Sequence, residues 1–295
     1  MIDLHTHTSY SDGTDKVTSL LENAEKKGIS VLSITDHNTA MAYEELENLD
    51  IKKYYSGKII PGIELNTKIL GVPIEILGYG IDYKIINEIL KDVYISAEKR
   101  NAIEVQRLYE KCLSAGIKID ENCLDNFDGK SFASKFIQNE INKYPENVNI
   151  ISEDALADTK VFYRKYMSNP EGILYVEMDD LVPDFETASN VIKQSGGLVF
   201  LPHIFEYREN SEKILEFILK NYKIDGIECF YTTFSKEQKE FLISLCKDKG
   251  LYMSGGSDYH GLNKPNVELG TGFGDLLVEE SVIKDWYKNT VVLPY

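Results

Sequence analysis

Residues 2–13 read IDLHTHTSYSDG, a short apolar segment that leads directly into two histidines and an aspartate. Such an apolar segment is typical of a β-strand. Because side chains alternate between the two faces of a strand, His5 and His7 point the same way and can share one metal ion. Imidazoles combined with a carboxylate such as Asp12 suit Zn, Mn or Fe. The segment therefore predicts a strand whose end holds metal ligands.

All five histidines of the 295-residue chain lie in segments of this kind. The other segments also place a histidine or a carboxylate at the end of an apolar run: Thr35-Asp36-His37-Asn38, Gly62-Ile63-Glu64-Leu65, Leu201-Pro202-His203 and Gly256-Ser257-Asp258-Tyr259-His260-Gly261. Asp258 and His260 repeat the spacing of His5 and His7. One histidine at a strand end is more often a hydrogen-bonded residue than a ligand. The joint pattern, however, predicts a polynuclear metal centre.

Strand-like segments alternate with amphipathic helical segments over much of the chain. Strands are expected at Ile2–Thr6, Val31–Thr35, Lys58–Leu65, Ile74–Tyr79, Gly197–Leu201, Asp225–Phe230 and Leu251–Ser254, with helices such as Val17–Lys27, Ser211–Asn221 and Lys236–Lys249 between them. Repeated strand-helix units favour a parallel α/β sheet with right-handed crossovers. Seven such strands predict a closed or nearly closed barrel, and parallel barrels carry their chemistry at the carboxyl ends of the strands.

The pattern changes to helices without clear strands between about residues 88 and 192. The helices are expected at Ile86–Ala115, Lys130–Lys143, Ala155–Met167 and Thr187–Gln194. We therefore predict a barrel made of residues 1–87 and 193–295, with a helical insertion at 88–192. Barrel enzymes place lids over the strand ends, so we expect the insertion to cap the C-terminal ends of the strands.

Charge and composition restrict the class of partner. The chain has 48 Asp and Glu residues against 32 Lys and Arg, a formal net charge of −16. This charge argues against binding to long nucleic acids, which depends on Lys and Arg replacing counterions, but it allows a small phosphorylated substrate held by bound cations. The four cysteines have no C-x-x-C spacing, and neither a signal peptide nor a membrane-spanning apolar run is apparent. These features predict a cytoplasmic protein with reduced thiols and no membrane partner.

The ordered motifs resemble those of the PHP superfamily, named for polymerase and histidinol phosphatase. The motifs are H-x-H-T-x-x-S-D-G, T-D-H-N, G-I-E, a P-H where A-H-P is usual, and G-S-D-x-H-G. They cover both ends of the chain. The insertion, with Glu98-Lys99-Arg100-Asn101 and Gly116-Ile117-Lys118-Ile119-Asp120, is similar to the branch of small metal-dependent phosphoesterases. The resemblance implies a distorted, TIM-like (β/α)7 barrel that holds two or three divalent ions of Mn, Fe or Zn.

The resemblance also implies how the ligands are divided. His5, His7, Glu64 and Asp258 would bind the first ion, and Glu64 would bridge to a second ion that His203 also binds. Asp12, His37 and His260 would bind a third. Relatives carry a further histidine eleven residues after the bridging glutamate, where this chain has Glu75. We expect Glu75 to be a ligand that shifts the preference toward harder ions such as Mn or Fe or weakens the second site, the alternative being a carboxylate in solvent or in an ion pair.

Three further residues are candidates for the chemistry of the reaction. Lys130, in Gly129-Lys130-Ser131-Phe132-Ala133, stands where relatives have G-R-P-H, so a point charge replaces a bidentate arginine. Arg100 and Lys130 are candidates to neutralise phosphate oxygens, although a basic residue on a helix is more often simply solvated. Asp36, beside His37, is a candidate to orient a ligand imidazole or to move a proton.

The expected activity is hydrolysis of a phosphoester of a small metabolite or short nucleotide. Two ions would hold a bridging hydroxide and stabilise the charge that develops at phosphorus. Three alternatives stay open: a histidinol-phosphate phosphatase, a 5′-to-3′ exonuclease on short oligonucleotides, and a metal-stabilised binding module without turnover. The insertion together with the altered G-R-P-H stretch disfavours the first, and the number of candidate ligands disfavours the last.

Overall fold

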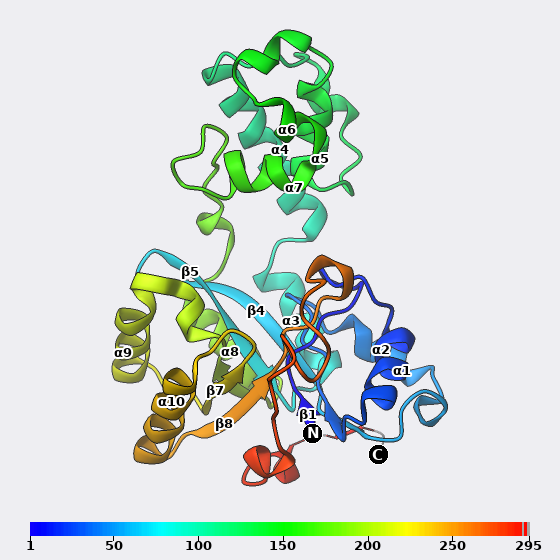
Figure 1. The fold of residues 1–295 in the computed structure, drawn as a ribbon, viewed down its shortest axis with the longest axis vertical. Coiled ribbons are helices and arrows are strands. Elements are labelled where there is room, and N and C mark those ends of the chain that lie inside the picture. The colour runs from blue at the N-terminus through cyan, green and yellow to red at the C-terminus, as the bar shows by residue number, and fades with distance from the viewer. Residues whose placement is uncertain (291, 294–295) are drawn as a thin grey trace. The chain divides into compact units, whose positions relative to one another are not determined.

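The structure, a computed structural model, describes residues 1–290 and 292–293 and divides the chain into two compact units (Figure 1). We call Met1–Val93 together with Val182–Tyr295 the sheet unit, and Tyr94–Leu181 the helical unit. Both unit boundaries lie inside the insertion expected at 88–192. The reason is that α3 (Tyr83–Val93) and α8 (Phe185–Gln194) pack against each other, and α8 also packs against three strands of the sheet unit.

The strands of the sheet unit form two sheets. The smaller sheet has the parallel order β1 (Ile2–Asp3), β2 (Val31–Leu32) and β3 (Lys58–Ile59). The larger sheet has the order β4 (Gly62–Ile69), β5 (Val72–Tyr79), β6 (Leu198–Leu201), β7 (Gly226–Tyr231) and β8 (Tyr252–Gly256). Isolated parallel bridges, Thr6 with Tyr259 and His37 with Glu64, connect the two sheets where the metal-ligand motifs lie.

This α/β arrangement differs from the expected (β/α)7 barrel, because the described strands form two sheets and not one closed barrel. The strand β5 is antiparallel to both β4 and β6, whereas a barrel of strand-helix units is parallel throughout. Local turn chemistry explains the difference. Leu70 and Gly71 both have positive φ, 54° and 75°, as a two-residue type I′ hairpin requires. Residues 62–79 therefore fold back directly, without a crossover helix.

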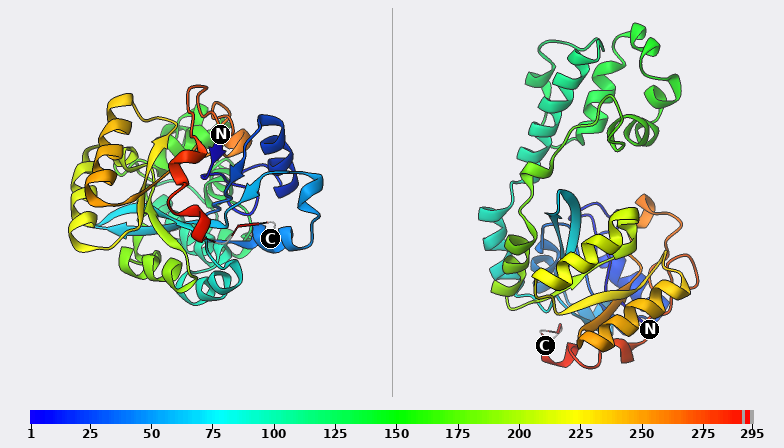
Figure 2. Two further views of the ribbon diagram at one scale, coloured as in Figure 1. Left: turned by 90° about the horizontal axis from the view of Figure 1, so that it is seen from below. Right: turned by 90° about the vertical axis from the view of Figure 1, so that its left-hand side faces the viewer.

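Helices cover the sheets of this unit. They are α1 (Val17–Lys27), α2 (Met41–Glu47), α3, α8, α9 (Ser211–Asn221) and α10 (Lys236–Lys249), with 3-10 turns at Ile51–Lys53, Ile204–Asn210, Gly261–Asn263, Glu280–Ile283 and Tyr287–Asn289. The expected bounds of α1, α9 and α10 are confirmed. Helix α10 lies along β7 and β8 (Figure 2). Helix α8 approaches β5 so closely that a Cβ on Gly78 would lie 3.0 Å from Cγ1 of Ile192.

The helical unit has its own apolar core. Its helices are α4 (Ala97–Ser114), α5 (Ala133–Ile141), α6 (Glu153–Ala157) and α7 (Thr159–Phe162), with a π-helical turn at Tyr163–Met167 and 3-10 turns at Cys123–Asn126, Pro145–Asn149 and Asp179–Leu181. Leu108, Ile137 and Phe162 are fully buried in the core. The single helix expected at Ile86–Ala115 is divided, because the Ser96 side chain accepts a hydrogen bond from Lys99 N and starts α4.

All four cysteines are free and buried. Among the helices that the structure describes, none is long and apolar enough to cross a membrane.

Candidate metal centre

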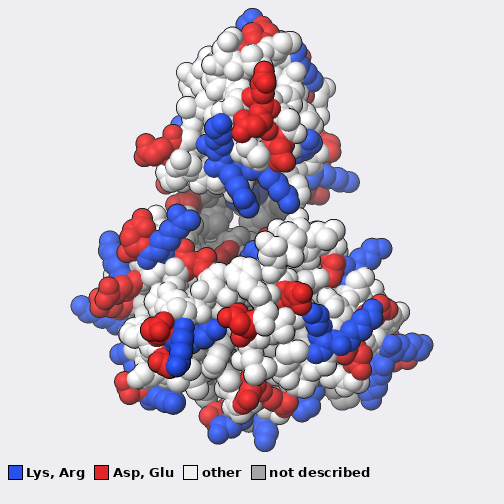
Figure 3. Space-filling model, viewed as in Figure 1, with Lys and Arg blue, Asp and Glu red and all other residues white. Residues whose placement is uncertain are grey.

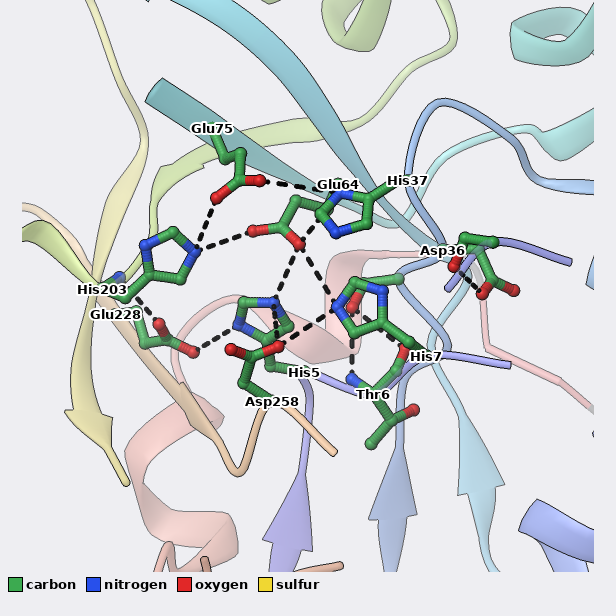
Figure 4. Close-up of polar contacts among 12 residues, drawn as sticks. His5, Thr6, His7, Asp36, His37, Glu64, Glu75, His203, Glu228 and Asp258 are labelled. Atoms are coloured by element: carbon green, nitrogen blue, oxygen red, sulfur yellow. Dashed lines mark hydrogen bonds and ion pairs between the residues drawn. The ribbon is translucent and has the colours of Figure 1, made fainter. Parts of the chain in front are cut away.

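The strand ends of the sheet unit bring the predicted ligands into one cluster (Figure 4). His5 and His7 follow β1, Glu64 lies on β4, Glu75 on β5, and His203 follows β6. The side chain of Asp3 holds β1 in place: its Oδ1 accepts from Ser257 N at 2.9 Å and its Oδ2 from Gly270 N at 2.7 Å. These buried hydrogen bonds join the first histidine motif to the segment that carries Asp258.

The carboxylate of Glu64 lies at the centre of the cluster. Its Oε2 is 3.2 Å from Nε2 of His5, 3.2 Å from Nε2 of His7 and 3.4 Å from Nδ1 of His37. Its Oε1 is 2.9 Å from Nε2 of His203. Glu64 is 1% exposed, so four imidazoles surround one buried carboxylate. This is the geometry of a carboxylate that can bridge two cations.

Asp258 closes the cluster on the side of the first two histidines. Its Oδ1 lies 3.3 Å from Nε2 of His7 and 3.6 Å from Nε2 of His5. Its Oδ2 accepts hydrogen bonds from the Tyr231 hydroxyl at 2.7 Å and from the Lys264 ammonium. One oxygen therefore faces the histidines, and the other is held by two donors.

Asp12 gathers a second set of histidines. Its Oδ1 lies 3.1 Å from Nε2 of His260 and 3.6 Å from Nδ1 of His7, and its Oδ2 lies 3.7 Å from Nε2 of His37. One ligand atom from each of these four residues lies within 4.8 Å of the others. Asp12 is 49% exposed, so this part of the cluster is the more open one.

Glu75 joins the cluster from the neighbouring strand. Its Oε2 is 3.3 Å from Nε2 of His203, and its Oε1 is 3.8 Å from Nδ1 of His37. Its neighbours Ile74 and Ile76 are buried on the opposite face, as strand alternation requires. The Tyr207 hydroxyl accepts a hydrogen bond from Glu75 N at 2.9 Å and steadies this part of β5.

The donor atoms fit divalent cations. Nε2 of His5, both ring nitrogens of His7 and Nδ1 of His37 are buried and make no hydrogen bond to any residue that the structure describes. Buried polar atoms in proteins are otherwise nearly always paired. Three groups of histidine and carboxylate atoms each lie within 4.8 Å of one another: His7-Asp12-His37-His260, His5-His7-Glu64 and His37-Glu64-Glu75. Mixed nitrogen and oxygen donors suit Zn, Mn or Fe.

The charges within the cluster are strongly coupled. Burial opposes a charge on His7, yet the nearby carboxylates of Asp258 and Glu64 raise its pKa to about 9. Burial opposes a charge on His203 as well, and Glu64 raises its pKa to about 9. Burial also disfavours ionised Glu64, but His5 and His37 hold its pKa well below the usual range. Positive charge is therefore favourable among these carboxylates, and a bound cation supplies it without protons.

Asp36 contacts the loop between the ligands and not a ligand imidazole. Its Oδ1 accepts hydrogen bonds from Thr8 N at 2.7 Å and from Ser11 Oγ at 2.6 Å, and its Oδ2 accepts from Thr8 Oγ1 at 2.6 Å. The carboxylate is buried. It thus shapes residues 8–11, which connect His7 to Asp12.

Arg100 and Lys130 belong to the helical unit. Arg100 lies on α4, where its guanidinium is 3.6 Å from the Glu104 carboxylate. Lys130 lies before α5, and its backbone N donates to Asp128 Oδ1 at 2.9 Å. The contacts described for these two residues stay within the helical unit.

Sequence reasoning missed the residues that support the ligands. Glu228, on β7, is fully buried, and its Oε1 lies 3.0 Å from Nδ1 of His5. Its Oε2 accepts a hydrogen bond from His203 N at 2.8 Å. A signal was present, because residues 226–228 repeat the tripeptide Gly-Ile-Glu of residues 62–64. Tyr207, Tyr231 and Lys264 carried no comparable signal.

Two candidate ligands have strained backbones. His203 has φ 25° and Asp258 has φ 58°, in the left-handed region that non-glycine residues rarely adopt. Such conformations cost on the order of 1–3 kcal/mol each and persist where the surrounding structure holds them, typically at functional sites. Both residues follow a strand, and their side chains lie in the cluster.

Comparison with known proteins agrees with this geometry. A model of the PHP domain family matches residues 3–227. A 5′-3′ exoribonuclease from Haemophilus influenzae is 28% identical over 292 residues, which cover 97% of this chain and 98% of that protein. A phosphoribosyl 1,2-cyclic phosphate 1,2-diphosphodiesterase from Eggerthella lenta is 26% identical, covering 88% of this chain and 94% of the relative.

The fold is also that of a solved structure. A protein from Bifidobacterium adolescentis described as a metal-dependent phosphoesterase superposes with a TM-score of 0.67 at 22% identity, covering 98% of this chain and 96% of that one. The match of the family model over most of the chain, together with relatives that cleave phosphoester bonds, decides the class. This chain belongs to the PHP domain family and is a metal-dependent hydrolase of phosphoester bonds.

Proposed function

We propose that this enzyme hydrolyses a phosphoester of a small metabolite or a short nucleotide, using two or three divalent ions held by the cluster. The observation that carries the proposal is Glu64, a buried carboxylate with an imidazole within 3.4 Å on four sides. Without cations such a carboxylate depends on protonated histidines, and bound cations would take the place of those protons. An arrangement of this kind is suited to holding a phosphate and a water molecule together.

The ligand sets that we propose follow the contacts of the cluster. The first ion takes His5, His7, Glu64 and Asp258; the second takes Glu64, Glu75 and His203; the third takes Asp12, His37 and His260. His7 and His37 also approach neighbouring sets, at 3.6 Å from Asp12 and 3.8 Å from Glu75 respectively. The three sets are therefore continuous, and occupation of one is expected to influence the next.

Glu75 is expected to determine metal preference. It gives the second set two carboxylates and one imidazole, which is a harder donor set than one with a second histidine. We therefore favour Mn or Fe over Zn at this position. When bound, the ions supply Lewis acidity and an activated water molecule. The chain itself holds the donors in place through Glu228, Asp36 and the strained backbones of His203 and Asp258.

The charge of the protein surface favours a small substrate over a long nucleic acid. The net charge is −16, and on the face shown in Figure 3 acidic and basic side chains are interspersed over the sheet unit. A long nucleic acid is normally bound by a continuous row of basic residues. A 5′-to-3′ exoribonuclease is nevertheless the second candidate, because the Haemophilus influenzae relative is named for that activity and aligns with nearly the whole of this chain. A binding module without turnover stays disfavoured, because the two relatives compared above are named as enzymes.

The experiment that tests this proposal combines metal analysis with a substrate panel. Protein purified without chelator is assayed for phosphate release from nucleotides, nucleoside bisphosphates, sugar phosphates and histidinol phosphate, and for mononucleotide release from 5′-phosphorylated oligoribonucleotides of increasing length. Turnover that is greatest on the small compounds supports the first candidate. Turnover that rises with chain length supports the exoribonuclease instead. No turnover on any compound, in protein reloaded with Mn, Fe or Zn, contradicts both.

A further inference from the structure

Lys264 places an ammonium group against the candidate metal centre. It follows the 3-10 turn Gly261–Asn263, six residues after Asp258, and its Nζ donates a hydrogen bond to Asp258 Oδ2. The other oxygen of the same carboxylate faces His5 and His7. The Lys264 side chain is 40% exposed, whereas the Asp258 side chain is 7% exposed. The Lys264 ammonium therefore lies between the buried candidate ligands and the solvent.

The turn that carries Lys264 is fastened to the loop that carries Asp12. Asn263 Nδ2 donates to Asp12 O at 2.6 Å, and Leu262 N donates to Thr14 Oγ1 at 2.8 Å. Gly261 has φ 60°, and a Cβ at this position would lie 2.2 Å from Thr14 Oγ1. Only glycine fits such a close approach at this φ. The ammonium is thus positioned by a fixed turn at the edge of the cluster.

Support of Asp258 alone does not explain a lysine here. The Tyr231 hydroxyl already donates to the same oxygen at 2.7 Å from the buried side, so this oxygen has a neutral partner. The Lys264 side chain is partly exposed, so water screens its ion pair with Asp258. An ammonium has three donors, and the contact with Asp258 uses one of them. The exposed side of the group remains accessible to an anion that enters the centre.

We propose that Lys264 is a substrate-binding residue, whose ammonium holds a phosphate oxygen of the substrate at the metal centre. This inference rests on the proposed phosphoester substrate. A positive charge beside the reacting phosphate stabilises the negative charge that develops on its oxygens. Lysine serves as a point charge in this role, where arginine would give a two-pronged contact. Lys264 belongs to the same unit as the ligands, unlike Arg100 and Lys130.

The test measures phosphate binding and kinetics separately. Inorganic phosphate is titrated calorimetrically into the metal-loaded enzyme, and KM and kcat are measured with p-nitrophenyl phosphate and with the best compound of the panel. A charged hydrogen bond to phosphate corresponds to about tenfold or more in affinity. Lys264→Met is expected to weaken phosphate binding and to raise KM by about that factor, with unchanged metal content. Lys264→Arg, which keeps the charge, is expected to recover most of the loss.

Two further variants separate substrate binding from support of Asp258. Tyr231→Phe removes the other hydrogen bond to Asp258 Oδ2 and leaves the ammonium, so it is expected to reduce metal affinity and not phosphate affinity of the fully loaded enzyme. Lys27→Met is the matched control, because Lys27 forms an exposed ion pair with Glu268. The Lys27→Met variant is expected to bind phosphate with the affinity of the wild type.

Three results would overturn the inference. The first is a wild-type enzyme that binds no phosphate. The second is a Lys264→Met variant whose phosphate affinity and KM are unchanged. The third is a Lys264→Met variant that loses metal, as Tyr231→Phe does, but whose metal-loaded form binds phosphate like the wild type. These results differ from failure of the proposed function, which is absence of turnover in the wild type. The phosphate titration decides the role of Lys264 even when no substrate of the panel is cleaved.

Discussion

Oε1 of Glu228 lies 3.0 Å from Nδ1 of His5, and both side chains are fully buried. A carboxylate oxygen at this distance accepts a hydrogen bond from Nδ1–H of His5, which would leave the lone pair of Nε2 to a bound cation. That nitrogen faces Glu64 at 3.2 Å and Asp258 at 3.6 Å. Glu228 thereby selects the tautomer in which His5 can bind a cation, as carboxylates behind metal-binding histidines commonly do.

Replacement of Glu228 by Gln is predicted to weaken metal binding by roughly 10- to 100-fold, the usual effect of losing such a support. The amide has one accepting oxygen, whereas Glu228 accepts from both His5 and His203 N. Calorimetric titration of chelator-treated protein with Mn²⁺ measures the effect. Glu240→Gln, on the exposed face of α10, is the matched control. Equal affinities for the two variants would show that Glu228 does not position His5.

Purified protein is predicted to contain two to three metal equivalents. Asp12, His37 and His260 form a set beyond the two that share Glu64, so a binuclear enzyme would not need them. Elemental analysis before and after dialysis against a chelator measures the content, and turnover should disappear and return on reloading. One equivalent or fewer after reconstitution with Mn, Fe and Zn would count against the three sets.

Removal of His5 is predicted to abolish turnover while the protein stays folded. His5 contacts Glu64 and Asp258, so the first set loses a ligand, but His5 is not part of the two apolar clusters built by Leu108 and by Leu77 and their described neighbours. The measurements are turnover, metal content and the thermal unfolding temperature of His5→Ala. If His5→Ala keeps most of its activity, the assignment of the first set is incorrect.

Glu75→His is predicted to preserve or raise activity and to move the best metal toward Zn. The imidazole would replace a harder, charged donor beside His203 and His37. Glu75→Ala is predicted to reduce occupancy of one set. Activity with Mn, Fe and Zn, together with metal content, distinguishes the two variants. Unchanged content and rate in Glu75→Ala would make Glu75 a bystander.

Asp36→Asn is predicted to destabilise the loop at residues 8–11. Three hydrogen bonds converge on the buried carboxylate, and bonds to charged groups are worth about 1.5–3 kcal/mol each. The amide cannot accept all three, so the unfolding temperature and the retention of the ion near Asp12 should both fall. Asp50→Asn, at an exposed ion pair with Lys53, is the control. A variant that matches this control would show that Asp36 does not organise the loop.

Much of the candidate centre could be predicted from local sequence. His5 and His7 lie two residues apart on a strand end, and Glu75 alternates with the apolar Ile74 and Ile76. Strand periodicity is a local property, so it identifies which side chains share a face. The helices α1, α9 and α10 were predictable for the same reason, since their apolar spacing is contained within each segment.

The pairing of the strands depended on tertiary structure. The sequence indicated strands near β4 and β5 but not their antiparallel pairing, because the hairpin at Leu70–Gly71 depends on two positive φ angles. The partner of β5 on its other side is β6, more than a hundred residues later in the chain. Strand order across such a separation is decided by which apolar faces pack together, as α8 against β5 and β6 shows.

The sequence alone determined which residue types stand at the strand ends, and hence the metal chemistry and the PHP resemblance. Only the tertiary structure decided which groups support and surround them. Glu228 contacts His5, which lies 223 residues away in the sequence. Tyr231, which precedes Asp258 in the chain, and Lys264, which follows it, both donate to one oxygen of Asp258. The physical reason is that ligand type and strand periodicity are properties of a few consecutive residues. A hydrogen bond between distant segments, in contrast, forms only when the folded backbone brings both partners within about 3 Å.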